Sequence, residues 1–156
     1  MTRANRLIGL PVILDGAKIG VVDQLDFSPD ARQISALTVQ TNGLKSGSIP
    51  ACNVQLVGEN AVLVTAAPVQ RRSGRFVPGR VRDTSGLMLG IVTDVMVDET
   101  TLSVTALELS FGPIDDILTG RRWVKEFSRD PKSGETIVPC EAWLINEGGG
   151  LNESGN

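Results

Sequence analysis

The stretch Asp15-Gly16-Ala17-Lys18-Ile19-Gly20-Val21-Val22 returns 70 positions later as Ser85-Gly86-Leu87-Met88-Leu89-Gly90-Ile91-Val92. Both glycines of the first copy and the apolar positions around them are kept in the second. The same offset relates Leu37 to Leu107 further along the chain. One short unit is therefore written twice, and the pattern predicts two similar small domains.

Composition favours strands over helices throughout the chain. The 156 residues include 17 glycines and 8 prolines, with many Val, Ile, Leu and Thr between them. Such a composition is typical of short β-strands joined by tight turns. We therefore expect an all-β fold made of two small units.

About six short strands are expected in the first unit. Apolar or alternating stretches bounded by turn residues mark them. They are residues 10–14, a long strand from Lys18 to Phe27, and residues 33–39, 46–50, 52–57 and 61–64.

The four repeated glycines are predicted to be structural. Gly16 and Gly86 stand where a hairpin turn needs a positive φ angle. Gly20 and Gly90 lie inside the following strand, where a glycine marks a bulge or the close approach of another backbone. The repeat thus preserves a bend and a core rather than a ligand loop.

The second unit carries extra sequence. Matching Ile49-Pro50 of the first unit to Val138-Pro139 of the second predicts 19 added residues after the third strand. Pro113, two acids and Gly120 within the added stretch indicate a helix of one or two turns, which we expect to plug or lid the second barrel. A polar loop over 127–135 is expected to follow.

This order of elements resembles the PRC-barrel domain family, over roughly residues 7–66 and again 77–145. The resemblance rests on the opening apolar strand, the hairpin at 15–22, the Ile34 to Val39 strand and the Ile49-Pro50 step. It implies two tandem small PRC-type β-barrels with a short helix inserted in the second. The expected division is repeat 1 over 1–70, a basic linker over 71–78, repeat 2 over 79–146 and a flexible tail over 147–156.

Several classes of active site are disfavoured by the residues the chain lacks. It has no histidine and no tyrosine, which removes the commonest general base and a common metal ligand. Cys52 and Cys140 have no CxxC partner, and we expect them to be buried, reduced thiols. We expect no catalytic residue, metal or cofactor.

Charge is distributed unevenly along the sequence. Residues 1–70 have no net charge, residues 71–82 carry +5 and residues 83–156 carry −8. Arg71, Arg72 and Arg75 are candidate partner-binding residues in the basic stretch, which alternatively attracts the acidic half of the chain. A nucleic-acid contact is disfavoured because aromatic residues make up only 4% and the pI is near 5.0.

The second group of candidate partner-binding residues lies around the expected helix. Arg and Trp are enriched at binding hot spots, which points to Arg121, Arg122 and Trp123. Core packing of Trp123 is the alternative. Asp115 and Asp116 are adjacent and diverge on a helix, so they suit its positive end better than a metal site. Trp143 falls in a pattern of a closing strand, Ala142-Trp143-Leu144-Ile145.

Function is inferred from the family resemblance. It implies a non-catalytic adaptor module that docks onto another protein or complex, with self-association to a homo-oligomer as a further expectation. Similar modules occur in the reaction centre H subunit and in a ribosome maturation factor. The alternatives are therefore an RNA or ribosome assembly factor using the arginine-rich link, and a peripheral partner of a photosynthetic reaction centre. No stretch of the sequence approaches the length of a membrane span, and we expect a bacterial cytoplasmic protein, either free or peripheral to a membrane complex.

Overall fold

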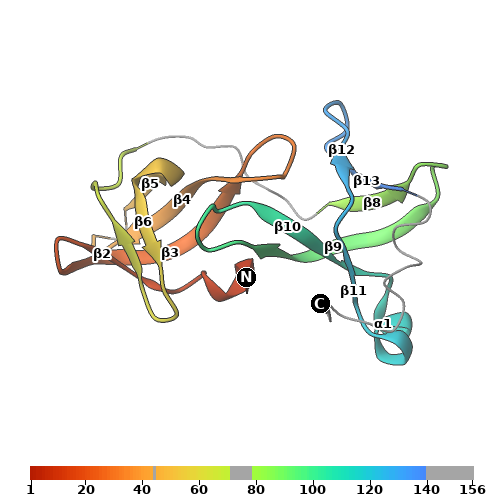
Figure 1. Ribbon diagram of the computed structural model, residues 1–156, viewed down its shortest axis with the longest axis horizontal. Helices are drawn as coiled ribbons and strands as arrows, with labels where there is room; N and C mark the ends of the chain where they lie inside the picture. Colours follow the sequence, from red (N-terminus) through yellow and green to blue (C-terminus); the bar gives the residue numbers. More distant parts are fainter. Residues whose placement is uncertain (44, 71–78, 140–156) are drawn as a thin grey trace. The chain divides into compact units, whose positions relative to one another are not determined.

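The computed structural model describes residues 1–43, 45–70 and 79–139 (Figure 1). The chain divides into two compact units. The first comprises Met1–Phe76 together with Val97–Val104, and the second comprises Val77–Met96 together with Thr105–Asn156. A later segment of the sequence therefore belongs to the first unit.

The first unit is built on a six-stranded sheet with the order β5-β4-β3-β2-β7-β6. All neighbours are antiparallel except β2 and β7, which are parallel. The strands of this sheet are β2 (Pro11–Leu14), β3 (Ala17–Phe27), β4 (Ile34–Thr41), β5 (Ser46–Pro50), β6 (Val54–Val57) and β7 (Val62–Val64), and the short β1 (Thr2–Arg3) lies outside it.

The chain connections force this sheet to curl. β5 and β6 occupy opposite edges, yet only the 3-10 turn Ala51–Asn53 joins them. In a flat sheet those edges would be about 24 Å apart, at roughly 4.8 Å per strand. A link of three residues reaches only about 13 Å. The sheet therefore bends back on itself as a small barrel does.

The second unit repeats this architecture. Its sheet order is β11-β10-β9-β8-β13-β12, which is the order of the first unit with each label raised by six. β8 and β13 are the parallel pair, as β2 and β7 are. The elements are β8 (Arg80–Asp83), β9 (Met88–Val97), β10 (Val104–Ser110), α1 (Pro113–Thr119), β11 (Arg122–Val124), β12 (Ser128–Arg129) and β13 (Thr136–Val138). The expected all-β class, with a short helix in the second unit, is confirmed.

Strand register places the extra residues differently from the sequence alignment. Ile49 pairs with Leu37, and Val124 pairs with Leu107, the repeat partner of Leu37. Val124 therefore corresponds to Ile49, whereas Val138 lies in β13 beside β8. The predicted insertion of 19 residues is wrong because a local Val-Pro likeness was taken for an equivalence that only strand pairing defines.

The real extension is the connection that holds α1. Residues 42–45 join β4 to β5, whereas residues 111–121 join β10 to β11. The prediction of a polar loop over 127–135 is also wrong in part, because β12 lies within this range and Phe127 is buried. Phe127 completes the core where a loop of polar residues was expected.

Equivalent apolar positions fill both cores. The largest fully buried side chains come from the inward faces of corresponding strands, at apolar positions that the sequence repeat preserves. In the first unit they include Val12, Val22, Ile34, Leu37, Val39 and Ile49, and in the second they include Val81, Val92, Leu107, Leu109 and Val124. Burying each one stabilises its unit by about 1.5–3 kcal/mol relative to leaving it exposed.

Two strand glycines allow neighbouring backbones to approach. A Cβ atom on Gly20 would collide with the carbonyl oxygen of Gln40, and one on Gly90 would collide with that of Ser110. The β2–β3 and β8–β9 registers each shift by a residue next to these glycines. Gly16 and Gly86 have φ angles of 80° and 91° in the hairpin turns.

The turn within Val97–Val104 completes the first unit. The amide of Ile34 donates to the carbonyl oxygen of Leu102 at 2.9 Å, and the amide of Val104 donates to that of Arg32 at 2.8 Å. Gln33 Nε2 also donates to the carbonyl oxygen of Thr101 at 2.9 Å. These hydrogen bonds, together with the burial of Leu102, tie the turn to the beginning of β4.

Candidate docking site on the second unit

The most unusual surface of the second unit is an apolar stripe on α1. Ile114, Ile117 and Leu118 are spaced i, i+3, i+4, which places them on one face of the helix. They are 73%, 83% and 75% exposed, and no residue of α1 is buried. The prediction that this helix plugs or lids the barrel is therefore wrong, because its apolar face points to solvent. We call these three side chains the α1 stripe.

A polar anchor explains why the helix faces outward. Ser110 Oγ donates to Asp116 Oδ2 at 2.6 Å, and the Phe111 amide donates to Asp116 Oδ1 at 3.3 Å. At about 100° per residue, Asp116 lies nearly opposite Ile114 on the helix. Fixing the carboxylate against the end of β10 therefore turns the α1 stripe away from the sheet. Figure 1 shows α1 at one end of the second unit, next to β11.

Arg121 ties this anchor to a buried acid. Its Nε lies 3.5 Å from Asp116 Oδ2, and its Nη1 lies 3.3 Å from Glu108 Oε1. Glu108 is only 2% exposed and also accepts a 2.8 Å hydrogen bond from Thr93 Oγ1. The loop that carries α1 is thus held at both ends, by Ser110 before the helix and by Arg121 after it.

The electrostatics of the anchor favour its charged forms. The hydrogen bond from the Ser110 hydroxyl holds the pKa of Asp116 below its ordinary value, with help from the Phe111 amide and Arg121. The hydrogen bond with Glu108 and the charge of that carboxylate raise the pKa of Arg121, and Asp116 adds to the effect. Both shifts favour the charged forms of Asp116 and Arg121, which carry opposite signs.

The other residues proposed near the helix take different places. Trp123 is 5% exposed, which is the core packing considered as its alternative role. The Arg122 guanidinium lies 4.9 Å from the centre of the Phe111 ring, within cation–π range. Asp115 is exposed and lies on the helix between the α1 stripe and the anchored side. Of the five candidates around the helix, Asp116 and Arg121 are brought together directly.

Some predicted residues lie outside the part of the chain that the structure describes. These are Arg71, Arg72 and Arg75 of the basic link, Cys140, and Trp143. Within the described residues, no group of three or more Cys, Asp or Glu side chains is placed to hold a metal ion.

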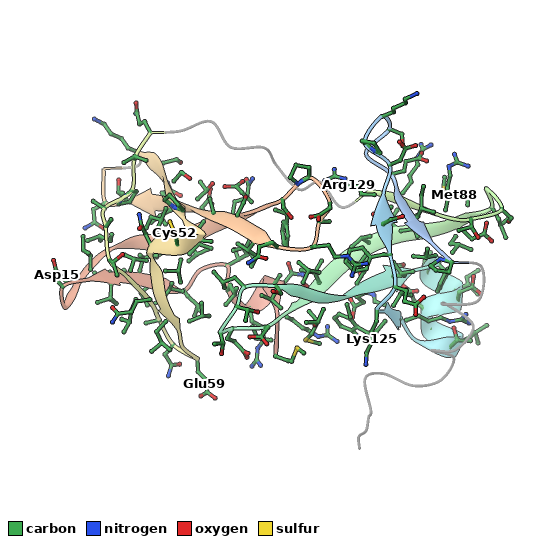
Figure 2. All side chains as sticks on the ribbon, turned by 45° about the horizontal axis from the view of Figure 1, so that its top comes forward. Asp15, Cys52, Glu59, Met88, Lys125 and Arg129 are labelled. Atoms are coloured by element: carbon green, nitrogen blue, oxygen red, sulfur yellow. The ribbon has the colours of Figure 1, made fainter. Side chains whose placement is uncertain are left out.

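Cys52 departs from its prediction. It lies in the 3-10 turn between β5 and β6 and is exposed, whereas burial was expected (Figure 2). The residue follows Pro50 at the barrel edge, where the connection between the two edge strands runs over the surface. Its thiol lies 3.8 Å from Asn53 Oδ1.

The sequence predicted the helix correctly but did not predict that the α1 stripe would be exposed. The i, i+3, i+4 spacing of the α1 stripe was present in the sequence, and such spacing usually marks the buried face. The signal that could have reversed this interpretation is Asp116, whose partner Ser110 lies just before the helix.

Comparison with known protein families bears on the first unit. Residues 1–71 match the family model of the PRC-barrel domain. The first unit is a PRC-barrel domain. PRC-barrel domains are small β-barrel modules that often mediate protein interactions and are generally non-catalytic. No curated protein matches the chain.

The second unit repeats the strand order of this PRC-barrel domain, including the parallel pair that joins the first and last parts of the sheet. It differs in the α1 connection, which replaces a short turn. The feature that sets the second unit apart therefore lies in the same connection as the candidate docking site.

Proposed function

We propose that this chain is a non-catalytic adaptor of the PRC-barrel type, which docks onto another protein in the cytoplasm through the second unit. The α1 stripe is the observation that carries the proposal. Three large apolar side chains held on one outward face by a polar anchor cost solvation free energy, and a partner surface relieves that cost.

The charge next to the stripe indicates the kind of partner. Asp115 is an exposed acid beside Leu118 on the helix. Arg121, the nearest base of the anchor, already pairs with Glu108 and Asp116. A partner with an apolar groove and a basic rim fits this arrangement, since complementary charge sets register and suppresses wrong partners.

The alternative hypothesis, that the α1 stripe inserts into a membrane, has little support. In the described residues, no helix has the length and hydropathy needed to cross a membrane. The acid beside the α1 stripe also disfavours the anionic surface of a lipid leaflet. A protein complex is therefore the preferred target.

The test is site-specific photo-crosslinking in native cells. A photoreactive amino acid at position 117 should crosslink one partner in stoichiometric amounts, and the same probe at Leu56, an exposed apolar residue of the first unit, should not. Ile117→Ser with Leu118→Ser should weaken co-purification of that partner about tenfold or more, because central apolar contacts dominate interface energies.

Two outcomes would contradict the proposal. Equal crosslinking from positions 117 and 56 would show that exposed apolar residues of this protein bind nonspecifically. Unchanged co-purification of the double serine variant would show that the partner binds elsewhere.

A further inference from the structure

The connection between β4 and β5 carries Asn42 followed directly by Gly43, the one Asn-Gly pair of the sequence. The amide of Thr41 donates to the carbonyl oxygen of Lys45 at 2.9 Å, and Thr41 Oγ1 donates to the same oxygen at 3.0 Å. Asn42 and Gly43 lie beyond this closure and are exposed. The pair therefore occupies the tip of a short surface loop, in the connection that corresponds to the one holding α1 in the second unit.

The surroundings of the pair allow it to change conformation. A Cβ atom at Gly43 would meet nothing within 4 Å, so the space beside its backbone is open. In the described parts of the chain, neither the Gly43 amide nor the Asn42 side chain forms a hydrogen bond. A movement that brings the two groups together thus breaks no described contact, and glycine adds backbone freedom that other residues lack.

We propose that Asn42 deamidates spontaneously in the folded protein, with the Gly43 nitrogen as the nucleophile and water as the other reactant. Asparagine is a thermolabile residue, because its side-chain carbonyl carbon lies within reach of the following backbone nitrogen. Gly43 has no side chain to block the approach to that nitrogen. The exposed loop tip gives water and hydroxide access to both groups.

The reaction has two steps, and both balance without a cofactor. The Gly43 nitrogen first loses its proton to hydroxide and bonds to Cγ of Asn42, which closes a five-membered ring. The side-chain nitrogen takes up a proton from water and leaves as ammonia. Water then opens the ring at either carbonyl carbon. Opening at Cγ gives aspartate, whereas opening at the backbone carbonyl carbon gives isoaspartate, in which the chain runs through Cγ.

Two other asparagines of the first unit lack this combination. Asn53 precedes Val54, whose branched side chain crowds the backbone nitrogen that would attack. Asn60 precedes Ala61, which also carries a Cβ atom beside the nitrogen, and the Ala61 carbonyl oxygen accepts from the Gly58 amide at 2.9 Å in the turn between β6 and β7. Asn53 and Asn60 are therefore internal controls for Asn42.

The products change the chemistry of this loop. Either one replaces a neutral amide with a carboxylate and adds one negative charge to the net −3 of the chain. Isoaspartate also lengthens the backbone by one carbon atom at the loop tip. Thr41 and Lys45 close the loop below this point, so we expect β4 and β5 to keep their pairing. The modification therefore marks the age of a molecule at a position outside the barrel core.

Ageing the purified full-length chain in a mildly alkaline buffer tests the proposal. After a short tryptic digestion, the peptide of residues 33–45 should gain one mass unit with time, localised to Asn42 by fragmentation. An isoaspartyl methyltransferase should label the same peptide. The peptide of residues 46–71, which holds Asn53 and Asn60, should stay unchanged. An unaged sample corrects for conversion during the digestion.

Gly43→Ala is the matched variant. Its added Cβ atom has room in the fold, but it crowds the attacking nitrogen and should slow the conversion of Asn42 at least several-fold. Unfolding the native chain in urea should change the rate at Asn42 by no more than a few-fold, because the folded loop already exposes the pair. Raising the pH should accelerate the conversion in both states, since the attacking nitrogen must lose its proton.

Three results would overturn the proposal. They are conversion in urea without conversion in the folded chain, an undiminished rate in Gly43→Ala, and equal conversion of the two peptides. The experiment uses the purified chain alone, so its outcome is independent of whether the proposed docking partner exists.

Discussion

Ser110 Oγ lies 2.6 Å from Asp116 Oδ2, and this contact determines which face of α1 meets solvent. The strand that ends at Ser110 passes so close to Gly90 that any side chain there would strike its carbonyl oxygen. The glycine of the repeated hairpin and the orientation of the helix are therefore parts of one arrangement, in which a backbone approach positions a hydroxyl and the hydroxyl positions a carboxylate.

Gly90→Ala should destabilise the second unit. The added methyl group has no room beside the Ser110 carbonyl oxygen, and overpacking of this kind costs about 1–3 kcal/mol. Gly20→Ala should act likewise on the first unit through Gln40. The measurement is the midpoint of urea denaturation, followed by a probe in each unit. Gly43→Ala is the control, since a Cβ atom at Gly43 meets nothing within 4 Å; a loss of stability as large as that of Gly90→Ala would refute the steric explanation.

Asp116→Asn should loosen the helix without unfolding the barrel. An amide accepts a weaker hydrogen bond from Ser110 and loses the charge that attracts Arg121. We expect faster hydrogen exchange of the amides of α1 and unchanged exchange in β9 and β10. Asp115→Asn removes the same charge one residue away and serves as the control. Equal acceleration in both variants would show that the helix depends on net charge rather than on the anchor.

Acid should release the same anchor. The folded-state pKa of Asp116 is lowered from its ordinary value of 3.8, chiefly by the Ser110 hydrogen bond. A carboxyl group of this kind contributes stability that is complete above its unfolded pKa and is lost as the pH falls through the folded pKa. The difference in Tm between the native chain and Asp116→Asn should therefore be constant above about pH 5 and shrink below 3.8. A difference that widens on acidification would contradict the assignment.

Cys52 should react readily in the folded protein. Its thiol is exposed in the turn after β5, so a thiol reagent needs no unfolding to reach it. In a Cys140→Ser background, one equivalent of thiol should be labelled at the same rate with and without denaturant, within a few-fold. Labelling that requires denaturant would show that the turn is covered in solution.

The duplicated hairpin was predictable because its information is local. Gly16 and Gly86 adopt the positive φ angles of the hairpin turns. Gly20 and Gly90 allow the backbone of the next strand to pass close by. The alternation of apolar residues around them fixes which side of each strand is buried. These properties need no knowledge of distant parts of the chain, and the all-β class follows from them.

The errors arose where a particular tertiary pairing or contact, rather than the local residue pattern, decides the outcome. Val138 resembles Ile49 in its local sequence, but the pairing of β11 with β10 gives that position to Val124. The apolar spacing in α1 suggested burial, but a hydrogen bond from Ser110 reverses the helix. Free cysteines are usually buried, which is why burial was predicted for Cys52. The connection between the two sheet edges instead places it on the surface.

The turn within Val97–Val104 determines when the first unit can finish folding during synthesis. The first unit includes that turn, and Ile34 bonds to Leu102 from it. During synthesis the N-terminal barrel can begin to form early, but it is finished only after Val104 has left the ribosome, when much of the second unit has already been translated. A chain cut after residue 71, where the family match ends, would be an unfinished domain.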